Sequence, residues 1–366
     1  MSWFNKIDST VLEYMDGLKK ENQRFRYYPV KEGLNEIGYK LDLGFSCYAL
    51  KIFKILDQVN TFPNNHINDW VDYLNSFQRS EDNNFVDQIY LDGFRQKNRL
   101  SGISIPLKVT LNYFTNSNFK SNKIKIENYI RAETKQTVST LFEINNKNYI
   151  NIYDFPITEE EIKNFLDNLN WSYPWSSGAQ YAALCVMAKT QLTNEKYQTA
   201  YNTLENYSNK ILNNETGLYY QGQFKNTEEV INGTMKILTG FDWLGFEIHH
   251  PTKIIDFCLN YNLAQRGCDI VDVVYVLYRC SKQTEYKRKE VKEFLNLVTK
   301  KIKKHFNQDG GFSYFENLNQ THYYDLKFAK SMNQSDIHGT LLCLWALVMI
   351  MDINDEKFFK YNILKP

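Results

Sequence analysis

The stretch NQDGGFSYFE, residues 307–316, places a polar turn and two glycines directly before three aromatic side chains. Glycine adopts positive φ readily and Asn or Asp satisfies local backbone groups, so the first half is a turn signal. A surface turn does not require the aromatic side chains of Phe312, Tyr314 and Phe315. Such large apolar rings are usually buried, so another element must cover them. The stretch therefore predicts a connection at which a turn packs against a neighbouring helix.

The segment before this turn, 291–306, carries apolar residues on one helical face and lysines on the other. The same order, an amphipathic helix followed by a polar turn with aromatics, recurs at 200–222 and more loosely at 70–87. Three occurrences predict a structural repeat in which these helices face outward.

A second type of helix is richer in apolar and small residues and begins with a polar cluster, which is typical of helices buried nearly all round. Six segments have this character: 40–56, 131–144, 176–192, 230–246, 268–280 and 335–353. Their alternation with charged helices predicts an all-α protein, an (α/α)6 toroid of inner and outer helices. We expect one domain over 1–366 with an irregular insertion near 81–128, where 102–114 fits either an insertion or another hairpin member.

The turn 308–312, between an outer and an inner helix, resembles those of the terpenoid cyclase and protein prenyltransferase superfamily. The resemblance implies a toroid with a funnel where the inner helices begin, and aromatics that pack beneath the turn instead of touching ligand. The catalytic motifs of that superfamily do not match. Val274 stands where a prenyltransferase needs its zinc thiolate, and Asp269 and Asp272 do not form the Asp-x-Asp-Asp motif of class II cyclases. The paired zinc cysteines and Cys-His dipeptide of LanC-type cyclases, which share the toroid, are also absent.

Composition narrows the environment and the partners. The formal net charge is +1, from 43 Lys and Arg against 42 Asp and Glu, so no long-range field favours nucleic acid or an anionic membrane. Residues 1–20 contain no apolar run that could act as a signal peptide or span, which predicts a soluble, cytoplasmic protein. Six dispersed cysteines without a Cys-x-x-Cys pair indicate buried free thiols. We expect no metal and no cofactor, and the oligomeric state stays open.

The catalytic candidates are Asp272 and His338, with Asp269 and Glu133 as further members. Asp269 and Asp272 share a face of an apolar helix and could share a proton, although an N-terminal capping role would explain Asp269 equally well. Both Asp272 and His338 come early in their helices, where the helix dipole favours a carboxylate and a neutral imidazole. The sequence thus predicts a general base at Asp272, and the alternative is that Asp272 and His338 are hydrogen-bonded structural residues.

Candidate substrate-binding residues lie where inner helices begin: Arg131, Gln136, Trp171, Tyr173, Trp175, Asn232, Ser335 and Asp336. An arginine there could clamp a phosphate or carboxylate, and the aromatics could stack on sugar rings or stabilise a carbocation. The alternatives are an outward salt bridge for the arginine, a loop plug over the core for the aromatics and a helix cap for Asp336.

These observations favour an enzyme whose funnel acts by carboxylate and histidine acid–base chemistry on a small molecule or glycan. The substrate would be an isoprenoid that is cyclised or transferred, or a glycan that is cleaved. The alternative is a non-catalytic toroid that binds a glycan or a protein partner. In an enzyme Glu133, Asp272 and His338 should converge, whereas in a binding protein they should scatter into separate contacts.

Overall fold

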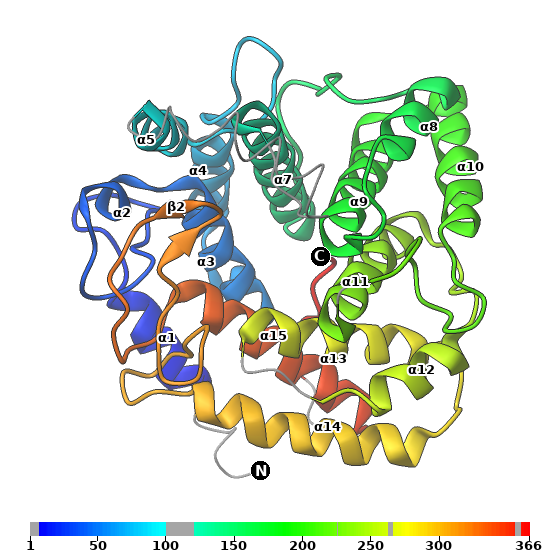
Figure 1. Ribbon diagram of the computed structural model, residues 1–366. Coiled ribbons are helices and arrows are strands. Elements are labelled where there is room, and N and C mark those ends of the chain that lie inside the picture. Colours follow the sequence, from blue (N-terminus) through cyan, green and yellow to red (C-terminus); the bar gives the residue numbers. More distant parts are fainter. Residues whose placement is uncertain (1–6, 100–120, 225, 263–265, 356–359) are drawn as a thin grey trace.

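The structure is a computed structural model that describes residues 7–99, 121–224, 226–262, 266–355 and 360–366 (Figure 1). Within these ranges it contains 14 α-helices, two short 3-10 helices (η2, Val59–Thr61; η3, Lys303–His305) and one two-stranded antiparallel sheet. The strands are β1 (His322–Tyr323) and β2 (Leu326–Lys327). The expectation of a mainly helical protein is confirmed.

All six helices predicted to be buried are present, with slightly different ends. They are α3 (Leu43–Ile55), α7 (Asn122–Glu143), α9 (Pro174–Gln191), α11 (Thr227–Leu244), α13 (Gly267–Ser281) and α15 (Ile337–Ile353). The largest difference is α7, which begins at Asn122 instead of residue 131. Ser121 caps it by accepting a hydrogen bond from the backbone N–H of Ile124, so the helix starts before its buried part.

These six helices contact one another in chain order. Helix α3 contacts α7, α7 contacts α9, α9 contacts α11, α11 contacts α13, α13 contacts α15, and α15 contacts α3 again. The series of contacts therefore closes on itself, as can be followed in Figure 1.

Amphipathic helices pack outside this series. Helix α4 (Asn64–Asn75) contacts α3, α10 (Asn194–Lys210) contacts α9, and α12 (Pro251–Leu259) and α14 (Arg288–Ile302) contact α13. The helices predicted at 70–78, 200–212 and 291–306 are thus confirmed, although α4, α10 and α14 begin earlier and end two to four residues before the predicted ends. The remaining helices are α1 (Ile7–Asp16), α2 (Glu36–Lys40), α5 (Gln88–Arg99) and α8 (Glu159–Asp167).

The three predicted turn repeats share one construction. Each turn is closed by an isolated antiparallel bridge whose second member is a fully buried aromatic: Gln78 with Phe85, Leu212 with Tyr219, and Phe306 with Phe312. The backbone N–H of each aromatic donates to a threonine hydroxyl on the next inner helix: Phe85 to Thr134 (3.0 Å), Tyr219 to Thr234 (3.3 Å), and Phe312 to Thr340 (3.0 Å). The aromatic ring and this hydrogen bond together fasten each turn to an inner helix.

The aromatic residues of the stretch 307–316 differ in their burial and in what they contact. Gly310 adopts a φ of 93°, and Phe312 is buried with its ring centroid 5.0 Å from that of Phe306. Phe315 is 36% exposed, whereas Tyr314 lines a cavity among the inner helices. The expected packing beneath the turn therefore describes Phe312 best.

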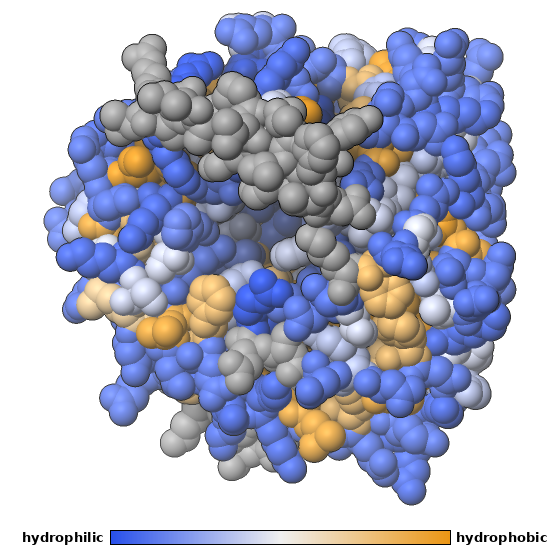
Figure 2. All heavy atoms as spheres, viewed as in Figure 1, coloured by the Kyte–Doolittle hydropathy of each residue, from blue (hydrophilic) through white to orange (hydrophobic). Residues whose placement is uncertain are grey.

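Part of the insertion expected near 81–128 is described: α5 lies in it, whereas 102–114 falls outside the described residues. Within the described ranges no helix combines the length and apolar character that crossing a bilayer requires. The face shown in Figure 2 is mostly hydrophilic, with hydrophobic residues in small separate groups.

Candidate active-site cavity

A cavity of about 390 Å³ is lined by all six inner helices. Its polar lining side chains include Tyr48, Lys51, Lys135, Gln136, Lys236, Asp272, Tyr314, Tyr324 and His338. Leu364 and Pro366 of the C-terminal segment also line it, and this segment is seen among the inner helices in Figure 1. Residues far apart in the sequence are thus brought to one cavity.

Helical spacing determines which side chains reach the cavity. On α15 the lining residues are His338, Leu341, Leu342 and Trp345, which follow the i, i+3, i+4, i+7 pattern of one helical stripe. Helix α7 presents the same stripe with Ala132, Lys135, Gln136 and Ser139. Helix α13 does so with Cys268, Val271 and Asp272.

Asp272 is the carboxyl of the cavity. Its side chain is 1% exposed, and Oδ2 has no hydrogen-bond partner among the described residues. The pKa of Asp272 is raised to about 7, chiefly by burial and also by the charge of Asp269, although Lys236 and Lys135 oppose the rise. The sequence predicted an ionised carboxylate at pH 7, but burial outweighs the helix dipole, so both protonation states are populated there.

His338 is held between two tyrosine rings. Its ring lies 4.7 Å from that of Tyr48 at an interplanar angle of 3°, and 5.4 Å from that of Tyr314 at 25°. Nδ1 lies 3.0 Å from Oε1 of Gln320, an oxygen that can only accept, so Nδ1 donates and Nε2 keeps its lone pair. Burial and the charge of Lys236 lower the pKa of His338 to about 3. The imidazole is therefore neutral, as predicted, although burial is the main cause.

Three lysines line the cavity, and the sequence reasoning missed all of them. Lys51 donates to Ser139 Oγ at 2.9 Å, and burial lowers its pKa. Lys135 and Lys236 come from α7 and α11. The signal that would have found Lys135 is its place beside Gln136 on the stripe that faces the cavity.

The walls of the cavity are mostly apolar. Trp175, Trp345, Leu341 and Met235 contribute to them, together with Val271. Of the predicted aromatic binding residues at 171–175, Trp175 alone lines this cavity, with its backbone N–H held by Glu229.

Asp269 lies outside the lining of the cavity and has an ion-pair role. Its Oδ2 accepts from Arg266 Nε at 2.6 Å, and its Oδ1 accepts from Asn232 Nδ2 at 2.8 Å. Asp269 and Asn232 are both 1% exposed, so they tie the start of α13 to α11. The structure thus separates Asp269 from Asp272, which the sequence considered as a pair.

Glu133 also lies outside the lining, one residue from the stripe of α7. It is fully buried, and its Oε2 accepts a 2.5 Å hydrogen bond from Tyr323. Its Oε1 has no partner among the described residues, and burial raises the pKa of Glu133 to about 8. Asp272 and His338 therefore converge on the cavity, whereas Glu133 sits behind a tyrosine.

Of the other predicted binding residues on α7 and just before α9, one lines the cavity and three lie outside its lining. Gln136 lines the cavity and donates to the backbone oxygen of Gly44 at 3.3 Å. Arg131 donates to Oε1 of Gln180 at 2.6 Å and lies outside the lining. Trp171 is buried and donates to a backbone oxygen of α8, and Tyr173 is the N-cap residue of α9.

Ser335 and Asp336 serve the turn 307–316. The carboxylate of Asp336 accepts backbone hydrogen bonds from Gly339, Tyr314 and Gln320, at 2.7, 2.7 and 2.9 Å. Ser335 Oγ donates to Asp309 Oδ1 at 2.6 Å. The capping alternative thus accounts for Asp336, and both residues connect the turn to α15.

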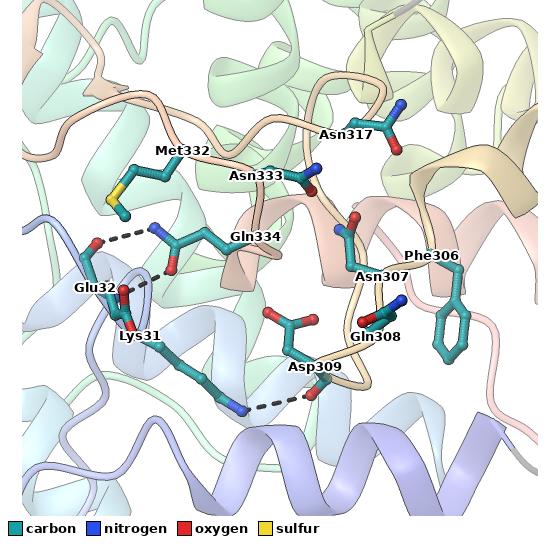
Figure 3. A pocket seen from close by; sticks show the side chains of 10 residues that line it. All are labelled: Lys31, Glu32, Phe306, Asn307, Gln308, Asp309, Asn317, Met332, Asn333 and Gln334. Carbon is teal, nitrogen blue, oxygen red and sulfur yellow. Dashed lines mark hydrogen bonds between the residues drawn. The ribbon is translucent and has the colours of Figure 1, made fainter.

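A larger hollow of about 600 Å³ lies beside that turn, and Asp309 is one of its lining residues (Figure 3). Figure 3 shows Lys31 reaching the backbone oxygen of Asp309, and Gln334 hydrogen-bonded to the backbone of Glu32. The other residues that line the hollow include Asn307, Gln308, Asn317 and Asn333, which carry amide side chains. This hollow contains no buried titratable side chain comparable to Asp272.

All six cysteines are free, and five of them are buried, as predicted. Among the described residues no three His, Cys, Asp or Glu side chains gather in a group that could hold a metal ion. No family model, no curated protein and no solved structure matches this chain, so the chemistry of the cavity alone must indicate what it does.

Proposed function

We propose that this chain is an α/α toroid enzyme that performs proton transfer on an apolar, isoprenoid-type small molecule, with Asp272 as general base. The closed series of contacts from α3 to α15, with amphipathic helices outside it, supports the toroid. The observation that carries the proposal is the carboxyl of Asp272, which is buried, lines a mostly apolar cavity and leaves one oxygen unpaired among the described residues. Such a group costs stability, and enzymes accept that cost at sites of chemistry.

The pKa of about 7 makes Asp272 a stronger base than an ordinary carboxylate while leaving it substantially deprotonated at neutral pH. It would remove a proton from a C–H or O–H group during cyclisation or transfer. Neutral His338, oriented by Tyr48 and Tyr314, would accept a hydrogen bond from the substrate at Nε2.

The walls favour an apolar substrate over a sugar. Trp175, Trp345 and Leu341 offer broad apolar surface, and the faces of the indole rings stabilise positive charge that develops on a hydrocarbon chain. A glycan would need a denser set of hydrogen-bonding groups on the same walls.

The pH dependence of turnover tests this proposal. We expect the rate of substrate consumption, screened by mass spectrometry with isoprenoid alcohols and diphosphates, to rise about tenfold per pH unit below pH 7 and to level off above it, as titration of one base requires. His338 stays neutral throughout this range, so its titration adds no second change of slope to the pH–rate profile. A rate that is flat or falls as pH rises through 7 contradicts a base at Asp272. So does a compound that binds, detected by tryptophan fluorescence, yet is never consumed.

A second candidate function is glycan binding without catalysis, and the hollow in Figure 3 favours it. Amide side chains at Gln308, Asn317 and Asn333 provide both donors and acceptors, a combination suited to sugar hydroxyls. Retarded migration of the protein in gels containing polysaccharide, unchanged by Asp272→Asn, would favour this function.

A further inference from the structure

The amines in the cavity have unequal surroundings. Lys51 is hydrogen-bonded to Ser139, whereas no hydrogen bond or ion pair joins the amines of Lys135 and Lys236 to the described residues. Two such lysines beside a carboxyl with an unpaired oxygen, all among the described residues, make an unusual lining for an otherwise apolar space.

The surroundings of half-buried Lys135 disfavour its charge on balance. Burial lowers its pKa well below the ordinary lysine value, and the charges of Lys236 on α11 and Lys51 on α3 lower it further. Cys185 on α9 and Asp272 on α13 oppose this shift and are outweighed. An amine with a lowered pKa is uncharged more often than an ordinary lysine and is therefore the better nucleophile, and desolvation together with a neighbouring cation is a known way to produce one.

We propose that Lys135 is a covalent nucleophile that forms an imine with an aldehyde or ketone substrate in this cavity, with Asp272 transferring the protons. The placement of Lys135, Lys236 and Asp272 around one cavity, from α7, α11 and α13, carries the inference. It rests on the proposed function, because it uses the same cavity and the same carboxyl. It narrows the substrate to an apolar molecule that bears a carbonyl group.

The step balances without any co-reactant. The nitrogen lone pair of Lys135 attacks the carbonyl carbon, the C=O π pair moves to oxygen, and the proton lost by nitrogen ends on that oxygen, giving a carbinolamine. Protonated Asp272 then donates its proton to the hydroxyl as the C–O bond breaks, water leaves, and the nitrogen lone pair forms the C=N bond. The resulting iminium cation lies beside the Asp272 carboxylate, which stabilises it.

Reductive labelling of the full chain tests the proposal. Hexanal and cyanoborohydride are added at pH 6 to 9, and peptide mass spectrometry measures the rate of labelling at Lys135 and at Lys289, whose side chain is 87% exposed. At pH 7 an ordinary lysine is only about 0.04% neutral. We therefore expect Lys135 to be labelled at least about tenfold faster than Lys289 at pH 7, with a rate that rises less steeply with pH than that of Lys289.

Two comparisons sharpen the result. Lys236→Met removes a neighbouring positive charge, so the labelling of Lys135 at pH 7 should slow several-fold, whereas Lys289→Met should leave it unchanged. Formaldehyde, the smallest aldehyde, is used in parallel to show whether the size of hexanal limits its entry into the cavity. Labelling of Lys135 by formaldehyde no faster than that of Lys289, or with the same pH dependence, overturns the proposal. This outcome is distinguishable from failure of the general base, since labelling needs no turnover and Asp272→Asn would still abolish consumption of a substrate.

Discussion

Asp272→Asn is expected to stabilise the protein above pH 7 while lowering turnover by roughly 100-fold or more, as loss of a general base does. Burial raises the pKa of this carboxyl from 3.8 to about 7 in the folded state. Because the folded state favours the protonated carboxyl, the full stability is present below the pKa of Asp272 in the unfolded chain. This stability is lost as the pH rises to the higher pKa of Asp272 in the folded state. This rise in pKa corresponds to roughly 4 kcal/mol of unfolding free energy lost by the wild type above pH 7.

Urea denaturation at several pH values measures this effect. The difference in stability between Asp272→Asn and the wild type should grow from pH 4 to pH 7 and stay constant above. Asp269→Asn is the matched control on the same helix, and it should destabilise the protein because Asp269 is paired with Arg266. An Asp272→Asn variant that is equally destabilised at pH 5 and pH 9 would show that Asp272 has a structural role.

Gly339→Ala is expected to destabilise the protein by about 3 kcal/mol, although alanine favours a helix over glycine by about 1 kcal/mol. A Cβ at Gly339 would lie 2.4 Å from the backbone nitrogen of Tyr314 and 2.5 Å from the carbonyl carbon of Ser313. Neither atom belongs to a flexible side chain, so the turn 307–316 would have to move away from α15. Because Phe312 and Asp336 hold that turn, its displacement breaks several contacts at once.

Gly17→Ala is the control for this prediction, since the nearest atom to its Cβ would be Cε of Lys31, 3.2 Å away near the end of a flexible side chain. Urea unfolding of both variants gives the comparison. Equal stability of Gly339→Ala and Gly17→Ala would mean that the turn does not pack on α15 as described.

The sequence predicted the helices well because their signals are local. Apolar residues all round 335–353 and on one face of 291–306 describe burial that depends little on which partner is present. The turn at 307–316 was also recognisable, because its two glycines favour a turn and its aromatic rings require an element to cover them. The sequence did not reveal that a threonine accepts a hydrogen bond from each turn, because Thr134, Thr234 and Thr340 look like ordinary helix residues.

The cavity was predicted less completely, for a physical reason. Asp272 and His338 drew attention because each interrupts an apolar helix, and both line the cavity. Lys135 lies among polar neighbours, where a lysine is unremarkable until the inner helices come together. Lys236, between Met235 and Ile237, interrupts an apolar run as Asp272 does and could have been found by the same signal. The sequence favoured Glu133 over Lys135, but a step of two residues rotates a side chain by more than half a turn, and the stripe facing the cavity belongs to Lys135.

The ionisation of Asp272 illustrates the same limit. Its position near the start of α13 predicted a carboxylate stabilised by the helix dipole, a contribution of about 1 kcal/mol. Complete burial costs several times as much, and burial depends on five other helices that no local pattern describes.

Direct titration of Asp272 tests the central claim of a buried base in an apolar cavity. The full chain is labelled with ¹³C at the aspartate carboxyl carbons, and the signal of Asp272 is identified as the one missing from Asp272→Asn. Its chemical shift, followed by NMR from pH 4 to pH 9, should change with a midpoint near 7. A midpoint near 4, the value of an ordinary aspartate, would contradict the account.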